Sequence, residues 1–205
     1  MNRTRNVAVL LYEHVDGLDF CGAFDVFATA SNWGKDFHTY TVSEKTGSIN
    51  TISSFTVVPK YNFHDCPKPD ILVIPGGIGA RTEMNNSDLT SWIYQTSKNS
   101  EIVLSICTGA LLLAKANLLS GLKVTTNQRA MDLLAQVAPE DCEILNNVRY
   151  IDNGKIVMSA GVTAGIDASL YVVSKLLGEE RAVETASRLE YIWNREPSLA
   201  QNIDS

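Results

Sequence analysis

The chain has 205 residues, of which 45% are hydrophobic and 20% are charged, and its formal net charge is −6 at pH 7. The negative charge, with no basic cluster to offset it, argues against a nucleic-acid partner. No apolar run approaches the ~18 residues that a membrane helix needs, and no signal peptide is visible, so we expect a cytoplasmic protein without a membrane partner. Length and composition predict one α/β domain at residues 1–196 and a polar C-terminal tail at 197–205.

Strands and helices are predicted to alternate along the first half of the chain. Apolar runs and their periods predict the elements in this order: a strand at 6–12, a helix at 18–30, strands at 37–42, 54–58 and 70–74, and an amphipathic helix at 88–98. This alternation favours a parallel sheet with right-handed crossovers.

The second half continues the same pattern. It predicts a strand at 102–106, a helix after it, a short strand at 123–126, a helix at 129–137, a strand pair formed by 143–145 and 148–152, and a strand at 155–159. A long helix should end at Leu177 because Gly178 is a typical C-terminal stop. A final helix is predicted from Glu179 to about Trp193.

Cys107 is the strongest candidate for a reactive residue. It follows the apolar run 102–106 and precedes a segment rich in Ala, Leu and Lys, so it lies at a predicted strand-to-helix turn that resembles a nucleophile elbow. Backbone N–H groups and the helix dipole at such a turn favour a thiolate, the form of cysteine that attacks electrophiles. The alternative is a buried cysteine that only fills space.

The other cysteines form no recognisable pattern. Cys21, Cys66 and Cys142 make no C-x-x-C pair and no metal-ligand spacing with Cys107. A chain of this length also needs no disulfide framework to fold. We therefore expect neither a metal nor another cofactor.

Three loops should meet at the carboxyl edge of the sheet, where open parallel sheets form their sites. The first is 13–17 with the following Asp19, the second is 75–79, and the third is Cys107 with Thr108 and Gly109. The glycines of the second loop leave N–H groups that could bind an oxyanion, although a tight turn is the ordinary explanation. Asp19 is also explained as a first-turn acid of a helix.

No histidine is a convincing base for Cys107. His38 falls within a predicted strand and His64 near a turn, so both are expected at the surface. His14 lies in the first loop but has no tie to Cys107 in the sequence. This absence restricts the chemistry more than any other feature.

Four segments together resemble the ThiJ/PfpI superfamily, and they occur in the order that this family shows. They are residues 15–27 (VDGLDFCGAFDVF), 70–77 (DILVIPGG), 106–110 (ICTGA) and 159–167 (SAGVTAGID). The resemblance implies a flavodoxin-like three-layer sandwich with a mostly parallel central sheet and a nucleophile-elbow cysteine, related to class I glutamine amidotransferases. It also implies a homodimer, with the first helix and the site loops close to the interface.

Within the superfamily the combination is most similar to the isonitrile hydratase branch. That similarity implies a lyase (hydro-lyase) that adds water to an isonitrile to give an N-substituted formamide. Cys107 would be the nucleophile that forms a thioimidate, Asp19 the general acid, and Thr108 a neighbour that positions the reacting group. The residues expected to bind the substrate or to face developing charge are Gly76, Gly77, Ile78, Asn127, Phe20 and Ile166.

The chain departs from the family pattern at two positions. Protease-like members carry a histidine directly after the nucleophile, where this chain has Thr108. Many relatives also have Thr-Thr-His-Trp where this chain has Thr125-Thr126-Asn127-Gln128. Both departures disfavour amide hydrolysis by a Cys–His pair.

Three other functions stay open on the sequence. A redox or stress-response protein would use the same turn to oxidise Cys107. Glyoxalase-like conversion of 2-oxoaldehydes usually requires a glutamate and a histidine, so Asp19 and Asn127 count against it. For a non-catalytic module that binds a small molecule, Asn127 is the best argument in the sequence.

Overall fold

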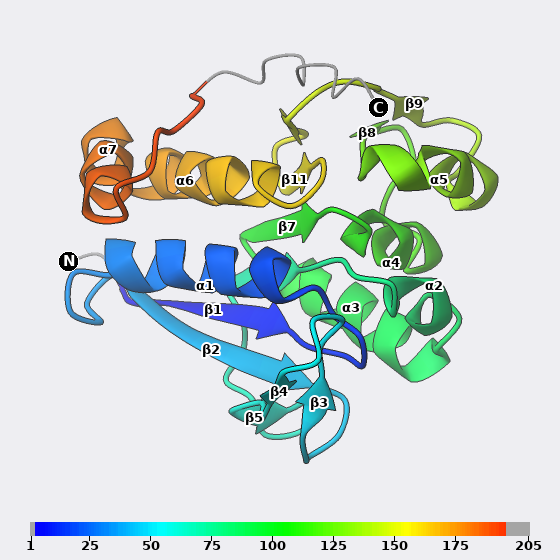
Figure 1. Cartoon of the computed structure of the whole chain (residues 1–205), viewed down its shortest axis with the longest axis horizontal. Coiled ribbons are helices and arrows are strands. Elements are labelled where there is room, and N and C mark those ends of the chain that lie inside the picture. Colours follow the sequence, from blue (N-terminus) through cyan, green and yellow to red (C-terminus); the bar gives the residue numbers. More distant parts are fainter. Residues whose placement is uncertain (1–2, 196–205) are drawn as a thin grey trace.

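The computed structural model describes residues 3–195 and contains a seven-stranded sheet, two small two-stranded sheets and flanking helices (Figure 1). The strands are β1 (Arg5–Leu10), β2 (Phe37–Ser43), β3 (Ile49–Asn50), β4 (Thr56–Val57), β5 (Tyr61–Asn62), β6 (Ile71–Ile74), β7 (Ile102–Ile106), β8 (Lys123–Val124), β9 (Glu143–Ile144), β10 (Tyr150–Asp152) and β11 (Ile156–Ser159). The helices are α1 (Gly17–Ala30), α2 (Ala80–Glu83), α3 (Ser87–Asn99), α4 (Gly109–Lys115), α5 (Met131–Val137), α6 (Ala164–Leu177) and α7 (Glu179–Arg188), with a 3-10 turn at Gln128–Ala130. None of the helices in residues 3–195 is long and apolar enough to cross a membrane. The predicted tail at 197–205 lies outside the described residues.

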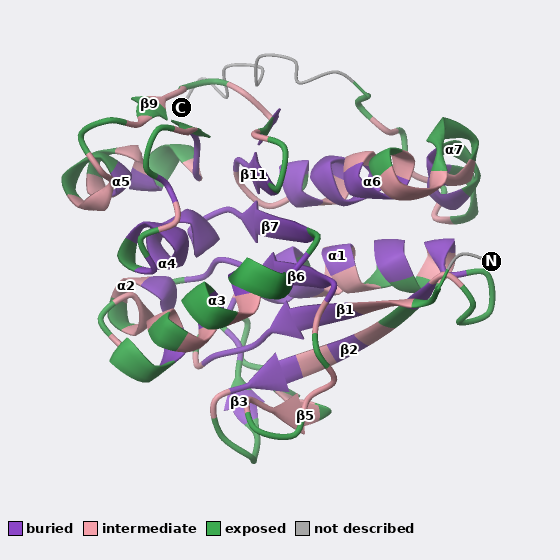
Figure 2. Ribbon diagram, turned by 180° about the vertical axis from the view of Figure 1, so that it is seen from behind, coloured by how far each residue is buried: buried purple, intermediate pink, exposed green. Residues whose placement is uncertain are grey.

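The main sheet has the strand order β10-β11-β7-β6-β1-β2-β5. Every neighbouring pair is parallel except β10 and β11, which form an antiparallel edge. Every residue of β6 and β7 is buried, as expected for central strands of a sheet that is covered on both faces (Figure 2). The predicted α/β fold with a mostly parallel central sheet is confirmed.

Two groups of helices cover the sheet. Helices α1, α6 and α7 pack on one another over one face, and α2, α3 and α5 pack around α4 on the other (Figures 1 and 2). This arrangement gives three layers. It also places the start of α1, the loop after β6 and the turn after β7 at the same edge of the sheet.

Two details differ from the sequence prediction. The predicted pairing of 143–145 with 148–152 is wrong, because β9 pairs in parallel with β8 while β10 pairs with β11. The last helix ends at Arg188 rather than near Trp193. Glu190 adopts a positive φ of 49°, and the Tyr191 N–H then donates to the Ala186 carbonyl, which is the geometry that closes a helix.

Candidate active site

Cys107 occupies a strained turn between β7 and α4. Its φ is 54°, in the left-handed region that non-glycine residues seldom adopt. The turn is held from two sides, because the Cys107 N–H donates to the carbonyls of Ser159 (3.2 Å) and Ala160 (3.1 Å). The Thr126 hydroxyl donates to the Cys107 carbonyl at 2.7 Å. The structure therefore places Cys107 at a turn with the geometry of a nucleophile elbow.

Position 109, two residues after Cys107, requires glycine. A Cβ on Gly109 would overlap the carbonyl oxygen of Ile74, at the end of the neighbouring strand β6. The close approach brings the turn after β7 against the 75–79 loop. Packing against β6 therefore requires the glycine of the Cys-Thr-Gly sequence.

The 75–79 loop holds two side chains of the predicted site. The Gly77 N–H donates to Thr108 Oγ1 at 2.9 Å, and the Thr108 hydroxyl donates to the Gly77 carbonyl at 2.9 Å. The Gly76 N–H donates to Asp19 Oδ2 at 3.0 Å. The Gly77 N–H, which we expected to face developing charge, is therefore already engaged by Thr108. A Cβ on Gly76 would collide with Thr108 and Asp19, so this approach also depends on glycine.

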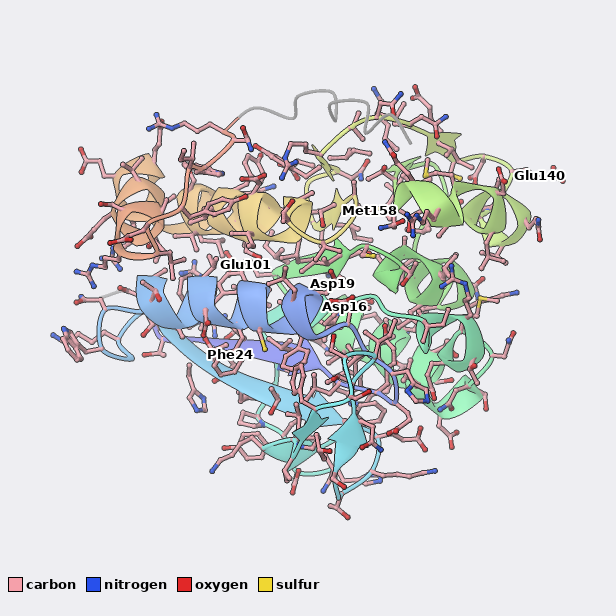
Figure 3. All side chains as sticks on the ribbon, viewed as in Figure 1. Asp16, Asp19, Phe24, Glu101, Glu140 and Met158 are labelled. Carbon is pink, nitrogen blue, oxygen red and sulfur yellow. The ribbon has the colours of Figure 1, made fainter. Side chains whose placement is uncertain are left out.

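Asp19 is a buried carboxyl group with one unused oxygen. The residue is 1% exposed and lies in the first turn of α1, where Figure 3 labels it beside Asp16. Its Oδ1 is buried and accepts no N–H or O–H hydrogen bond from the described residues. Burial, followed by the nearby Asp16 carboxylate, raises the pKa of Asp19 to about 7, against the opposing effects of the Gly76 N–H and the Cys107 thiol. Asp16, and not Asp19, caps the helix through the N–H groups of Leu18 and Asp19.

The Cys107 thiol is not the stabilised thiolate that the helix dipole suggested. Burial, together with the neighbouring Asp19 carboxylate, raises the pKa of Cys107 to about 12. The N–H groups of Thr108 and Val162 donate toward the sulfur and lower the pKa, but they do not outweigh burial. Helix α4 has only seven residues and begins two positions after Cys107, so its dipole contributes little.

As expected from the sequence, no histidine side chain in the described residues joins this pair. His14, His38 and His64 are exposed, and within residues 3–195 none of them interacts with Asp19 or Cys107. Asn127, where the family resemblance led us to expect a histidine, is partly buried, and its side chain accepts the Arg129 N–H at 3.0 Å. The same side chain packs against Gly161, so Asn127 does lie beside the 160–163 loop.

Three contributors were missed from the sequence. The Val162 N–H comes from a loop whose geometry has no local sequence signal. Thr126 contacts Cys107 because the chain folds back toward the site after α4, which the sequence does not show. Tyr12 ends the strand region of β1, donates its buried hydroxyl to the Pro75 carbonyl at 2.7 Å, and interacts electrostatically with both Asp19 and Cys107. The sequence signal that could have identified Tyr12 is its position directly before the 13–17 loop.

Apolar side chains lie around the start of α1. Phe20 is buried and Ile166 is partly buried, with the Ile166 side chain packed beside Gly22, whereas Ile78 is 49% exposed. The sequence did not indicate Phe55, whose ring lies against Gly17 and 6.3 Å from the ring of Phe20. Among the described residues, no three His, Cys, Asp or Glu side chains are grouped as metal ligands would be.

Comparisons with known proteins agree with this fold. The model of the DJ-1/PfpI family matches residues 5–175. Over 185 residues the chain is 30% identical to the isonitrile hydratase of Pseudomonas putida, covering 90% of this chain and 78% of that protein. Among solved structures, a ThiJ/PfpI family protein from Pseudomonas syringae superposes with a TM-score of 0.84 at 24% identity, covering 100% of this chain and 80% of the other. Drosophila melanogaster DJ-1beta gives 0.80 at 20% identity, covering 94% and 100%.

Proposed function

The chain belongs to the DJ-1/PfpI family, and we propose that it is a cofactor-independent cysteine enzyme that adds water to an isonitrile to give an N-substituted formamide. One observation carries the proposal: a buried carboxyl group with a free oxygen lies next to the Cys107 thiol. With the histidines exposed, Asp19 is the group placed to move the thiol proton.

The first step joins sulfur to the terminal carbon of the isonitrile. The S–H bond of Cys107 breaks as Asp19 accepts the proton, and the sulfur electron pair forms the new C–S bond. Asp19 then returns that proton to the same carbon, which gives a thioimidate, R–N=CH–S–Cys107. No free thiolate needs to accumulate, so a thiol pKa raised to about 12 is compatible with this route.

The second step is hydrolysis. Water adds its oxygen to the thioimidate carbon, and one of its protons goes to the nitrogen. The C–S bond then breaks, and the proton of the new hydroxyl group returns through Asp19 to the sulfur. The products are the formamide R–NH–CHO and the regenerated thiol, so the net reaction consumes one isonitrile and one water.

The other residues of the site would hold this pair in place. Gly76 fixes the Asp19 carboxyl through its N–H, and Thr108 ties the elbow to the 75–79 loop. Phe20, Ile78 and Ile166 would contact the apolar substituent of the isonitrile. Isonitriles are weak hydrogen-bond acceptors, so an apolar surrounding suits them.

The raised pKa of Cys107 counts against the redox alternative. Peroxide reacts with the thiolate, and a thiol whose pKa is about 12 supplies very little of it at neutral pH. Glyoxalase-like chemistry is disfavoured by the absence of a nearby histidine within the described residues.

The test is an isonitrile hydration assay on the purified protein. Cyclohexyl isonitrile and para-nitrophenyl isonitrile are incubated with the wild type, and formamide is quantified by chromatography. We expect turnover that is abolished in Cys107→Ala and lowered at least about a hundredfold in Asp19→Asn, because proton transfer by a positioned group contributes ~10²–10⁴-fold. The intact mass of Asp19→Asn should show no isonitrile adduct of Cys107, because formation of the C–S bond needs the Asp19 carboxylate to accept the thiol proton.

Two matched controls separate chemistry from folding. Asp25→Asn changes an exposed acid on the same helix, and Cys142→Ala changes a partly buried cysteine away from the site. Both should retain wild-type turnover. Absence of formamide with the wild type refutes the proposal; peroxide-driven mass gain at Cys107 would then support the redox function, and loss of methylglyoxal the glyoxalase function.

We also propose that the active form is a homodimer. Leu18, Ile52, Phe55 and Ile78 are between 43% and 49% exposed, although all are apolar. They lie on connected segments, because Phe55 contacts Gly17 and the Ile52 N–H donates to the Val15 carbonyl. Val15 in turn bridges to Gly77, next to Ile78. An apolar surface of this kind beside the site loops supports an interface with a second copy.

A further inference from the structure

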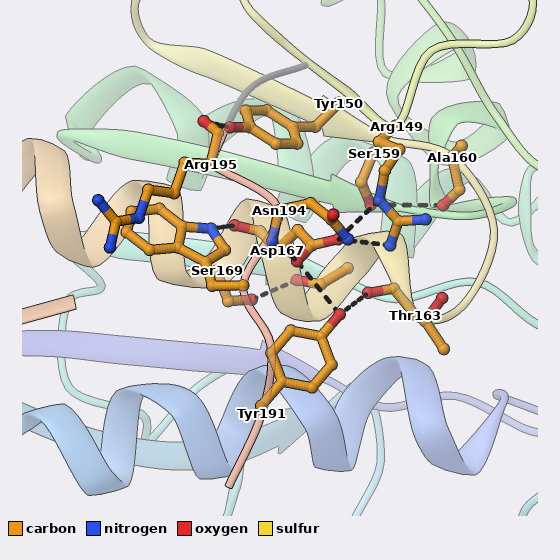
Figure 4. A network of polar contacts seen from close by, with 12 residues as sticks. Arg149, Tyr150, Ser159, Ala160, Thr163, Asp167, Ser169, Tyr191, Asn194 and Arg195 are labelled. Atoms are coloured by element: carbon orange, nitrogen blue, oxygen red, sulfur yellow. Dashed lines mark hydrogen bonds and ion pairs between the residues drawn. The ribbon is translucent and has the colours of Figure 1, made fainter. Parts of the chain in front are cut away.

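Asp167 is a fully buried carboxylate surrounded by hydrogen-bond donors (Figure 4). Arg149 donates its Nε to Asp167 Oδ2 at 2.7 Å and pairs with the same oxygen through a second guanidinium nitrogen. The Tyr191 hydroxyl donates to Oδ1 at 3.1 Å, and the Asn194 N–H donates to Oδ1 at 3.0 Å. The Trp193 indole N–H donates to the Asp167 carbonyl at 3.2 Å.

A buried charge with so many partners indicates a constrained position rather than a simple helix cap. Isolated buried carboxylates are costly, and a satisfied one holds every segment that supplies a partner. Three segments meet here: the approach to β10 at Arg149, the first turn of α6 at Asp167, and the chain after α7 at Tyr191 and Asn194. None of the groups in this network touches Asp19 or Cys107 directly.

The 160–163 loop lies between the network and Cys107. At one end the Ala160 N–H donates to the Arg149 carbonyl at 2.8 Å. At the other end the Tyr191 hydroxyl, which donates to Asp167, shares the same proton with the Thr163 carbonyl in a longer contact of 3.4 Å. Between these ties Val162 has a φ of 27°, a strained value for a β-branched residue. Such a conformation persists only where the surroundings impose it.

The strained residue faces the nucleophile. The Val162 N–H donates toward the Cys107 sulfur, and the Cys107 N–H donates to the Ala160 carbonyl. The loop is therefore bonded to Cys107 on one side and to the Asp167 network on the other. Two or three residues of backbone thus connect the network to the groups that contact Cys107.

We propose that Asp167 is a positioning residue: through Arg149 and Tyr191 it holds the 160–163 loop so that the Val162 N–H remains aimed at the Cys107 sulfur. Its consequence for isonitrile hydration rests on the proposed function, but its effect on the sulfur does not. An N–H directed at sulfur favours the charged form, so loosening the loop lowers the reactivity of Cys107. Asp19 on α1 and Tyr12 after β1 also interact with Cys107, and the substitutions below leave both intact.

The test is the pH dependence of Cys107 alkylation by iodoacetamide, followed at the level of the Cys107 peptide by mass spectrometry. The principal variant is Tyr191→Phe, which removes one hydroxyl from the surface of the network. Its matched control is Tyr171→Phe, because that hydroxyl also donates to an aspartate, Asp152 at 2.6 Å, which lies outside the 160–163 loop. Asp167→Asn and Arg149→Lys complete the series, since lysine keeps the charge but not the paired hydrogen bonds.

We expect the alkylation rate at pH 8 to fall about threefold in Tyr191→Phe and about tenfold in Asp167→Asn and Arg149→Lys. The curve of alkylation rate against pH should also move to higher pH, because the sulfur loses a hydrogen bond that favours its charged form. Tyr171→Phe should match the wild type. If Asp167→Asn does not fold, judged by its thermal transition, Tyr191→Phe decides the matter. Folded variants with the wild-type profile overturn the proposal. Since alkylation needs no isonitrile, a wild type without hydratase turnover would refute the proposed function and leave this test standing.

Discussion

The Asp19 carboxyl group and the Cys107 thiol form a buried pair in which burial raises the pKa of both members, to about 7 and about 12. Coupled groups lose their protons in two steps that belong to the pair. Between these two values the pair holds one proton. That singly protonated pair is the form in which Asp19 can accept the thiol proton.

The rate of isonitrile hydration should therefore rise with pH through about 7. Below this value Asp19 is protonated and cannot accept a proton, so kcat/KM should fall about tenfold for each unit of pH. The measurement is kcat/KM from pH 5 to pH 9 with a buffer series of constant ionic strength. A rate that is flat across this range would contradict Asp19 as the acceptor, and Asp25→Asn should keep the wild-type profile.

Asp19→Asn should stabilise the fold at pH 8 but not at pH 4. The pKa of Asp19 is raised from its ordinary value of 3.8 to about 7 in the folded protein, so the folded state binds the proton more tightly than the unfolded state. Folding stability from this group is complete below about pH 4 and is lost as the pH rises through 7. At 1.36 kcal/mol per unit of pKa the loss is about 4 kcal/mol at pH 8. Urea unfolding of the wild type and Asp19→Asn at both pH values measures it, with Asp25→Asn as the control.

Thr108→Val should impair both stability and turnover, whereas Thr108→Ser should preserve them. Valine matches the shape of threonine but leaves the buried N–H and carbonyl of Gly77 without their partner, which costs about 1 to 3 kcal/mol. Serine keeps the hydroxyl. We expect turnover to fall more than about tenfold for valine, because a misplaced 75–79 loop also displaces Asp19 through Gly76. Loss in serine without loss in valine would mean that the methyl group, not the hydroxyl, matters.

The dimer proposal predicts a sedimentation-equilibrium mass of twice the chain mass. Replacing Leu18 or Phe55 by aspartate puts a charge into the apolar surface beside the site and should shift the mass toward that of a monomer. Val183→Asp on α7 introduces the same charge at a residue of similar exposure, 38%, on another surface and should leave the mass unchanged. A wild-type monomer at micromolar concentration would refute the proposal.

Much of the fold could be predicted because its signals are local. The apolar run of β7 was placed at its observed limits, and the stop of α6 at Gly178 follows from a φ of 94° that suits glycine. The partners of β9 and β10 could not be placed, because strands of two and three residues carry no register in their own pattern. The end of α7 depends on Glu190, a residue type with no preference for the left-handed conformation that it adopts.

The sequence by itself was enough to predict the pair that we propose to be reactive: a Cys-Thr-Gly turn after a buried strand, an acid at the start of the first helix, and no histidine suited to join them. The tertiary structure decided their chemical state. The sequence suggested a thiolate, yet packing removes Cys107 and Asp19 from water together and raises the pKa of each. Desolvation depends on what the whole fold places around a group, so no local pattern encodes it. For the same reason only the structure shows that the Val162 N–H and the distant Asp167 network reach the sulfur.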